Sequence, residues 1–264
     1  MSPLTWYLSS ALYLSAVPGI TTVDLQPHTT AAFDRYIESA EQRLDRQAHS
    51  ERFLWIDSNP AHKTRVAQGE AVSEPYSGNG DIDVPDGLIH DWVGAVFIPH
   101  ASIERVIASA QDYNSHTAFY SPELQASKIV RKDGKTFDVY MRLLKKRVIT
   151  VVLDTDHHVT YFPLEDARWY SVSHSTRIAE VSNPGDAAET EMTPGHDHGF
   201  LWRLNSYWHF EQRDGGVYVE CEAISLSRSV PVGFGWLVNP IVRALPRESL
   251  ANTLRAMRES VLAR

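Results

Sequence analysis

His174 is the residue whose position in the sequence most favours acid–base chemistry. It lies in a run from Arg168 to Val181 whose alternating pattern predicts a strand, so its even positions share one face. If that face points inward, desolvation would move the pKa of His174 and its imidazole could exchange a proton, with Tyr170 as partner. A core histidine with satisfied hydrogen bonds is the competing interpretation. The even positions of this strand are Tyr170, Val172, His174, Thr176 and Ile178.

Two further clusters contain groups that can bind metals. His196, Asp197 and His198 are consecutive, and a second cluster runs from Asp154 to His158. Imidazole and carboxylate groups suit zinc or non-haem iron. Neither cluster has the i, i+4 helical spacing that places two ligands on one face, so we predict no metal site.

Nucleophilic and cofactor chemistry have little support in the sequence. No serine stands in a G-x-S-x-G elbow, and Cys221 lies inside a predicted strand, where a thiol behaves as a small apolar group. Gly233 and Gly235 follow Pro231 and lack a β-α-β context, so they predict a turn rather than a dinucleotide loop. We therefore expect no cofactor.

The Asp214-Gly215 pair predicts a β-hairpin and sets the register of its two strands. A two-residue loop places Trp208 opposite Cys221 on a largely apolar face. Such a face either fills a core or lines a cavity, to which Ser206 would contribute a hydrogen bond. With the even positions of the strand before it, this face supplies the candidate ligand-binding residues. They are Tyr170, Val172, His174, Trp202, Leu204, Ser206, Trp208, Phe210, Val219 and Cys221.

Patterning along the chain places these candidates in a fold of the α+β class. Apolar residues at three- and four-residue steps predict amphipathic helices from Thr30 to Leu44, from Ala101 to Tyr113 and from Pro246 to Ala263, with a shorter one over Trp236–Leu245. Alternating and β-branched runs predict strands between them. The predicted strands are Leu88–Ile98, Ala126–Arg131, Thr136–Lys145, Arg147–Leu153, Val159–Leu164, Arg168–Val181, Phe200–Arg213 and Val217–Arg228.

Composition and charge exclude several classes of protein. Of 264 residues, 43% are hydrophobic and 22% are charged, which fits a folded chain and neither a disordered segment nor a coiled coil. Thirty-three acidic residues against 25 lysines and arginines give a net charge of −8, so we expect no nucleic-acid partner. The single cysteine allows no internal disulfide.

The amino-terminal part divides into an uncharged segment and a helical one. Residues 1–23 carry no charged side chain and contain an apolar run too short to span a bilayer. This run favours a signal peptide and export to the periplasm or the exterior, although no basic residue precedes it. The alternative is a cytoplasmic chain whose apolar arm packs on the domain. We expect residues 24–86 to form a helical extension and a linker, and residues 87–264 to form the main domain.

Two stretches of the main domain carry a resemblance to a known superfamily. The opening, IHDWVGAVFIPHASIERVIASAQDYNSH, reads as a strand ended by proline and a helix that ends at Asp112 and Tyr113. The close runs from GFLWRLNSYWHFEQRDGGVYVECEAISLSRS to LANTLRAMRESV. Together with the element order, these stretches resemble the START-like (SRPBCC) superfamily, which includes polyketide cyclases, aromatases and lipid-transfer domains. They are more similar to its bacterial members than to its enzymes.

The resemblance covers about two thirds of the chain and implies a helix-grip fold. In that fold a long carboxy-terminal helix closes a curved antiparallel sheet, and a hydrophobic ligand occupies the cavity between them. Here the helical segment of residues 24–86 would be an amino-terminal extension.

Three functions agree with these observations. The first is non-covalent binding or transport of a hydrophobic small molecule or lipid. The second is a cyclase- or aromatase-like enzyme, which would need an inward acid–base pair such as His174 with Tyr170. The third is a protein-interaction or assembly module whose core is filled by its own side chains. An open apolar cavity favours the first, an aligned polar pair inside it the second, and a closed core the third.

Overall fold

The structure is a computed structural model that describes residues 21–146, 150–229 and 245–263. The predicted signal-like segment up to residue 20 and most of the predicted helix Trp236–Leu245 lie outside the described residues. Among the residues that are described, no helix is both long and apolar enough to cross a bilayer.

In the described part of the chain, seven long strands form the body of the fold, and five short ones lie at its margins. The long strands are β4 (Gly87–Pro99), β5 (Leu124–Asp133), β6 (Thr136–Lys146), β7 (Thr150–Pro163), β8 (Arg168–Ser182), β11 (Arg203–Arg213) and β12 (Gly216–Arg228). The short strands are β1 (Val23–Asp24), β2 (Val72–Pro75), β3 (Asp81–Val84), β9 (Thr190–Glu191) and β10 (His196–Asp197). One antiparallel sheet has the order β2-β4-β12-β11-β8-β7-β6-β5, with β3 added beside β4 and β9 beside β8. β1 pairs with β10 apart from this sheet.

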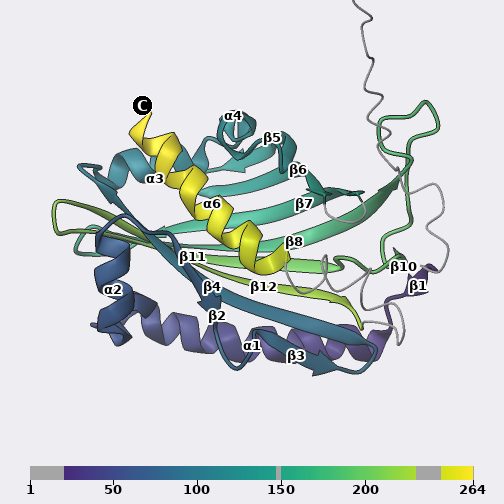
Figure 1. The fold of residues 1–264 in the computed structure, drawn as a ribbon, viewed down its shortest axis with the longest axis horizontal. Helices are drawn as coiled ribbons and strands as arrows, with labels where there is room; N and C mark the ends of the chain where they lie inside the picture. Colours follow the sequence, from purple (N-terminus) through teal and green to yellow (C-terminus); the bar gives the residue numbers. More distant parts are fainter. Residues whose placement is uncertain (1–20, 147–149, 230–244, 264) are drawn as a thin grey trace, which may run out of the picture.

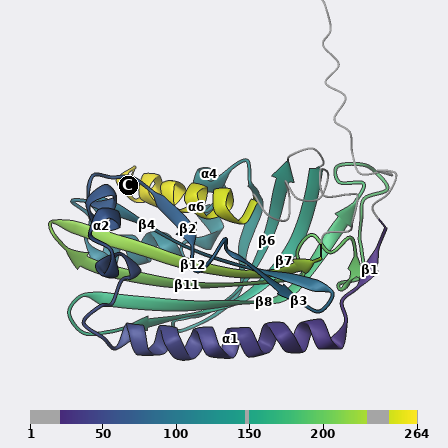
Figure 2. The same ribbon diagram turned by 60° about the horizontal axis from the view of Figure 1, so that its bottom comes forward.

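Two long helices lie on opposite faces of the sheet (Figures 1 and 2). α6 (Leu245–Leu262) crosses the concave face, and α1 (Pro27–Ala48) runs along the outer face. Among the described residues, the shorter helical elements are η1 (Trp55–Ser58), α2 (Pro60–Ala67), α3 (Ile103–Gln111), η2 (Tyr113–Ser115) and α4 (Thr117–Tyr120). This arrangement is the expected α+β helix-grip architecture with an amino-terminal helical extension.

Local sequence signals account for several of these elements. Asn59 caps α2 by accepting a hydrogen bond from the amide of Ala61 at 3.0 Å, and Pro60 occupies the first helical position, where its missing amide proton costs nothing. Asp214 and Gly215 both have positive φ angles of 55° and 77°, which the tight turn between β11 and β12 requires. The predicted hairpin register is confirmed throughout, from Arg213 opposite Gly216 to Arg203 opposite Leu226.

β7 differs from the prediction of two strands separated by a turn. The structure has one continuous strand through the acidic run 154–156. Asp154 is buried there because Tyr140 donates a hydrogen bond to its Oδ1 at 2.6 Å, and Arg142 lies 3.4 Å from its Oδ2. Aspartate usually favours turns, but these partners on β6 stabilise Asp154 within a strand.

The segment expected to be a linker contributes to the main sheet. β2 pairs with β4 through Val72 opposite Ala95, and β3 pairs with the same strand through Asp81 opposite His90. The expected boundary before residue 87 therefore passes between strands that are hydrogen-bonded to each other. The region 24–86 is helical in α1 and α2, and β-sheet after them.

Carboxyl groups are buried between α1 and the outer face of the sheet. Asp91, Glu220 and Glu222 are each at most 3% exposed. Arg43 of α1 donates to Glu222, and Tyr36 of α1 donates to Asp91 at 2.6 Å. Burial raises the pKa of Glu220 to about 8. Burial, together with the neighbouring charge of Glu222, raises the pKa of Asp91 to about 7.

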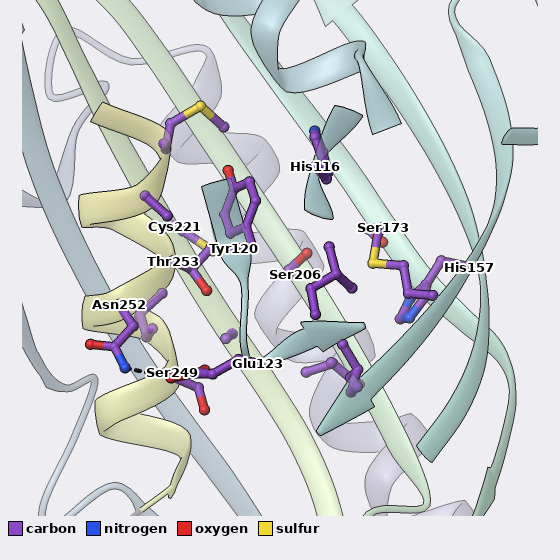
Figure 3. A pocket seen from close by; sticks show the side chains of 18 of the residues that line it. His116, Tyr120, Glu123, His157, Ser173, Ser206, Cys221, Ser249, Asn252 and Thr253 are labelled. Atoms are coloured by element: carbon purple, nitrogen blue, oxygen red, sulfur yellow. Dashed lines mark hydrogen bonds between the residues drawn. The ribbon is translucent and has the colours of Figure 1, made fainter. Parts of the chain in front are cut away.

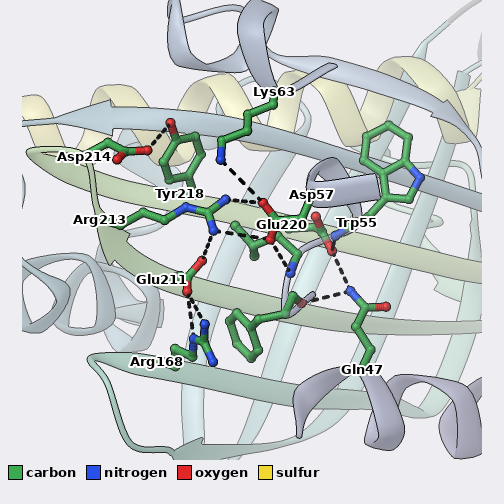
Figure 4. A network of polar contacts seen from close by, with 12 residues as sticks. Gln47, Trp55, Asp57, Lys63, Arg168, Glu211, Arg213, Asp214, Tyr218 and Glu220 are labelled. Atoms are coloured by element: carbon green, nitrogen blue, oxygen red, sulfur yellow. Dashed lines mark hydrogen bonds and ion pairs between the residues drawn. The ribbon is translucent and has the colours of Figure 1, made fainter. Parts of the chain in front are cut away.

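A second group of polar contacts holds η1 against the turn between β11 and β12 (Figure 4). Arg213 binds Asp57 of η1 at 2.6 Å and Glu211 of its own strand at 2.8 Å. Arg168 of β8 also binds Glu211, with 2.7 Å between Nε and Oε1. The outer face is therefore covered by the amino-terminal region through charged, mutually bonded groups.

Candidate functional site

A cavity of about 520 Å³ lies between α6 and the concave face of the sheet (Figure 3). α6 forms one wall, strands β6, β7, β8, β11 and β12 form the other, and the segment from η2 to the start of β5 closes one side. This volume falls in the range of cavities that enclose small organic ligands. Much of the wall is apolar, with side chains that include Met141, Leu143, Val159, Phe210 and Met257.

α6 is held above the cavity by its apolar stripe. Leu254, Met257 and Val261 are at most 4% exposed, as their helical spacing predicts. Gly94 of β4 gives the room for the crossing, because a Cβ atom there would lie 2.8 Å from Cδ1 of Leu254 and 2.6 Å from the carbonyl oxygen of Val72. The helix is therefore seated on β4, and the cavity extends from there toward β6 and β7.

Half of the candidate ligand-binding residues line this cavity. They come from the hairpin, whose register followed from its two-residue turn. The alternation of β11 and β12 brings them to one face, beneath α6. They are Leu204, Ser206, Trp208, Phe210 and Cys221.

Three candidates on β8 lie on the opposite face, which corrects their placement. Tyr170 and Val172 pack against clusters that the amino-terminal region forms on the outer face, and His174 binds Glu41 of α1 with 2.6 Å between Nε2 and Oε1. The reason is the register, because Ser206 of β11 stands opposite Ser173. Even residues of β11 therefore share a face with odd residues of β8.

Two other candidates are buried without lining the cavity. Val219 is fully buried in the core cluster beneath α6. Trp202 precedes β11, packs in the cluster with α1, and donates from its indole nitrogen to Asp197 at 2.9 Å. Both contribute to packing at their positions.

The cavity contains polar residues that alternation along a single strand did not assign. Ser171 and Ser173 are the odd positions of β8, directly paired with Trp208 and Ser206 of β11. His157 lies in the wall formed by β7. The pairing between β8 and β11 was the signal that would have placed these serines. We refer to His157, Ser171, Ser173 and Ser206 as the polar band.

The hydrogen bonds of His157 define its tautomer. Its Nε2 lies 3.0 Å from Oγ1 of Thr155, whose hydroxyl donates to the carbonyl oxygen of Met141 at 3.0 Å. Because the Thr155 proton is used in that bond, Oγ1 accepts a proton from Nε2, and Nδ1 carries the lone pair. Burial lowers the pKa of His157 to about 4, so its ring is neutral at pH 7.

A group of polar side chains lies at the edge of the cavity beside the amino-terminal half of α6 (Figure 3). Lys145 of β6 binds Glu123 at 3.0 Å and Ser249 of α6 at 2.7 Å, and Asn252 of α6 donates to Glu123. We call these four residues the rim cluster. They join the start of β5 and the end of β6 to α6.

In the ranges that the structure describes, neither the predicted acid–base pair nor a metal-binding cluster is found in this cavity. The pair of His174 and Tyr170 lies on the outer face, so the inward pair that a cyclase-like mechanism would need is not formed by these residues. Among the described residues, no carboxylate bonds to His157. In those same ranges, no three His, Cys, Asp or Glu side chains are placed to hold a metal ion.

Solved structures with a similar course of the chain share few residues with it. A STAR-related lipid transfer protein of Xanthomonas axonopodis is 16% identical with a TM-score of 0.48, covering 69% of this chain and 99% of that one. A protein of Thermus thermophilus is 18% identical with a TM-score of 0.46, covering 65% and 96%. The Zhui aromatase/cyclase of Streptomyces sp. R1128 is 12% identical with a TM-score of 0.41, covering 67% and 95%.

No protein-family model matches the sequence, and the search of curated proteins found no relative. Fold assignment therefore depends on the elements described above. Across the residues that the structure describes, a strand, helices, six further long antiparallel strands and a closing helix follow one another, which is the element order that the resemblance to the START-like superfamily predicted. The chain has a helix-grip fold.

Proposed function

We propose that this chain binds a hydrophobic small molecule or lipid, non-covalently, in the cavity beneath α6. The observation that carries the proposal is the space of about 520 Å³ in a largely apolar wall. Protein interiors are normally packed as densely as organic crystals, and voids larger than a water molecule are few. Side chains around such a space lack contact partners on one side, and an apolar ligand would supply them.

The two alternative functions receive less support. An assembly module was expected to fill its core, whereas a cavity lies beneath α6. A cyclase-like enzyme was expected to place an acid–base pair inward, whereas His174 and Tyr170 are both on the outer face. The arrangement supports binding over turnover.

The first test is direct identification of a ligand. The protein is purified gently from its own host, measured by native mass spectrometry, and then extracted with organic solvent. We expect an added mass that extraction removes and that belongs to an apolar species. A clean unliganded mass, together with no binding of the fluorophore N-phenyl-1-naphthylamine, would contradict the proposal.

A pair of variants tests the location of binding. Trp208→Ala removes a large side chain from the cavity wall, and we expect about tenfold weaker binding of N-phenyl-1-naphthylamine. His174→Ala is the matched control, because His174 lies on the outer face, and its affinity should be unchanged. Equal loss in both variants would place the fluorophore elsewhere. Thermal unfolding of each variant confirms that it is folded.

A further inference from the structure

The polar band lies in the cavity wall formed by β7, β8 and β11, and it contains no charged group. We propose that the ligand carries an uncharged hydroxyl that donates a hydrogen bond to Nδ1 of His157, so that the cavity selects alcohols over the corresponding carboxylic acids. This inference rests on the proposed function and names the class of ligand.

The orientation of His157 makes it an acceptor. Nε2 donates to Oγ1 of Thr155, and the hydroxyl of Thr155 donates in turn to the carbonyl oxygen of Met141, with 3.0 Å between donor and acceptor in both bonds. Nδ1 is left with a lone pair, and the residue lines the cavity (Figure 3). A hydroxyl proton is a natural partner of the lone pair of a neutral imidazole.

The serines supply the second half of a hydroxyl site. Ser173 pairs with Val159, which is two residues along β7 from His157, so the diagonal neighbours lie within about 7–8 Å of each other. Ser206 accepts a hydrogen bond from the indole of Trp208 at 3.3 Å and keeps its own proton for a ligand. A ligand hydroxyl donating to His157 can therefore accept from a serine on the neighbouring strands.

A carboxylate fits the same place poorly. It would meet the Nδ1 lone pair of His157 with negative charge and would have no proton to donate. Two cationic side chains lie at the edge of the cavity: Lys145 is bonded to Glu123 and Ser249, and Arg255 is exposed to solvent and donates to Asn252. A buried anion without a counter-charge is strongly disfavoured.

The test is a competition between two molecules with the same hydrocarbon chain. N-phenyl-1-naphthylamine is bound to the protein at pH 7.5 and displaced with 1-dodecanol or with laurate. We expect 1-dodecanol to compete about tenfold more strongly than laurate. The alcohol gains a hydrogen bond to Nδ1 of His157, whereas laurate would bring a negative charge into the cavity. His157→Phe keeps an aromatic ring and removes the acceptor, so the fluorophore should still bind while the preference disappears.

A matched control is the adjacent residue. His158→Phe changes the same residue type on the other face of β7, where its Nδ1 binds Asp138 at 2.7 Å. This variant should keep the preference for 1-dodecanol. If its preference also disappears, the effect belongs to the strand and not to Nδ1 of His157, and the inference is wrong.

The outcomes separate this inference from the proposed function. If the fluorophore does not bind the unmodified protein, binding in the cavity itself is refuted. If it binds but both molecules compete equally, or laurate competes better, only the selection of alcohols is refuted. If His157→Phe does not fold, nitrogen-15 NMR of the unmodified protein gives a second test. The resonance of the unprotonated Nδ1 of His157 should shift when 1-dodecanol is added and should not shift when laurate is added. An unchanged resonance would overturn the inference.

Discussion

Consecutive residues of β12 stand in opposite surroundings, with Cys221 facing the cavity and Glu222 facing α1. The same holds on β7, where His157 lines the cavity and His158 lies on the other face. On the concave face, the polar band is neutral and has space beside it, and the charged Lys145 and Glu123 lie at the edge of the cavity. On the outer face, charged groups are dense, bonded to one another and covered by a helix.

The comparison teaches that residue type alone does not mark the binding face. The outer face carries the ionisable residue types that are common in functional sites, namely buried carboxyls, arginines and tyrosines. These groups nevertheless join the amino-terminal region to the sheet. The polar band of the concave face holds only serines and the neutral His157, yet it lies beside the space for a ligand. Space and unused hydrogen-bonding capacity distinguish a binding face from a structural one.

The largest effect among the variants that test this contrast between the two faces is expected from Arg43→Ala. Removing the guanidinium leaves Glu222 and Asp91 buried without their cation, which should lower the free energy of unfolding by about 3 kcal/mol. Urea unfolding measures this change, and Arg35→Ala, an exposed position on the same helix, is the control. A loss below about 1 kcal/mol would show that the outer face is not held by this ion pair.

A variant of the concave face should change binding rather than stability. Ala223→Phe places a large side chain in the cavity from β12, and we expect about 100-fold weaker binding of N-phenyl-1-naphthylamine, or about 3 kcal/mol. Ala187→Phe, on an exposed loop, is the control for the added ring. Unchanged affinity in Ala223→Phe would mean that the fluorophore does not enter the cavity.

The buried carboxyls predict a pH dependence that belongs to the outer face. Their pKa values, about 7 for Asp91 and about 8 for Glu220, lie above those of an unfolded chain, so the folded state binds more protons and loses stability as pH rises through these values. The opposing effect of His157 and His209, whose pKa values burial lowers to about 4, is confined mainly to pH below 6.5. Between pH 6.5 and 8 we expect a loss of about 2 kcal/mol.

Urea unfolding across that pH range measures the loss. Glu220→Gln cannot ionise and should show a flatter profile than the unmodified protein. Stability that increases with pH in this window would contradict a protonated outer interface.

The smallest effect is expected at the rim cluster. Lys145→Met removes the ion pair with Glu123 and the bond to Ser249, which join β6 to α6 at the edge of the cavity. Because partly exposed ion pairs contribute little, we expect ligand exchange to be about threefold faster and equilibrium affinity to be nearly unchanged. Stopped-flow displacement of N-phenyl-1-naphthylamine measures the rate, and an unchanged rate would indicate exchange by another route.

The length of the loop between two strands determined whether their pairing could be predicted from the sequence. The two-residue turn between β11 and β12 determines which residues of the two strands are paired, and the predicted pairing is confirmed. β8 and β11 are joined by residues 183–202, which leave the pairing free to shift by one residue. That shift reverses which side chains face inward, and for this reason Tyr170, Val172 and His174 were assigned to the cavity and Ser173 was not.

The amino-terminal region shows a second physical limit. The helical stripe of α1 was readable, and Phe33 and Leu44 are buried as predicted. The short strands β2 and β3 were not, because four residues with proline or aspartate carry little strand signal of their own. Their pairing with β4 depends on tertiary contacts, as does the burial of Asp91 and Glu222.

Cys221 gives the cavity a natural chemical reporter. It is the one cysteine of the sequence, it lies in the cavity wall, and burial holds the pKa of its thiol well above the usual value. Cys221 is 2% exposed, so we expect a ligand bound in the cavity to slow the reaction of its thiol with a neutral thiol reagent. The ratio of the rates with and without ligand, at one pH, therefore reports occupancy of the cavity without any substitution in the protein.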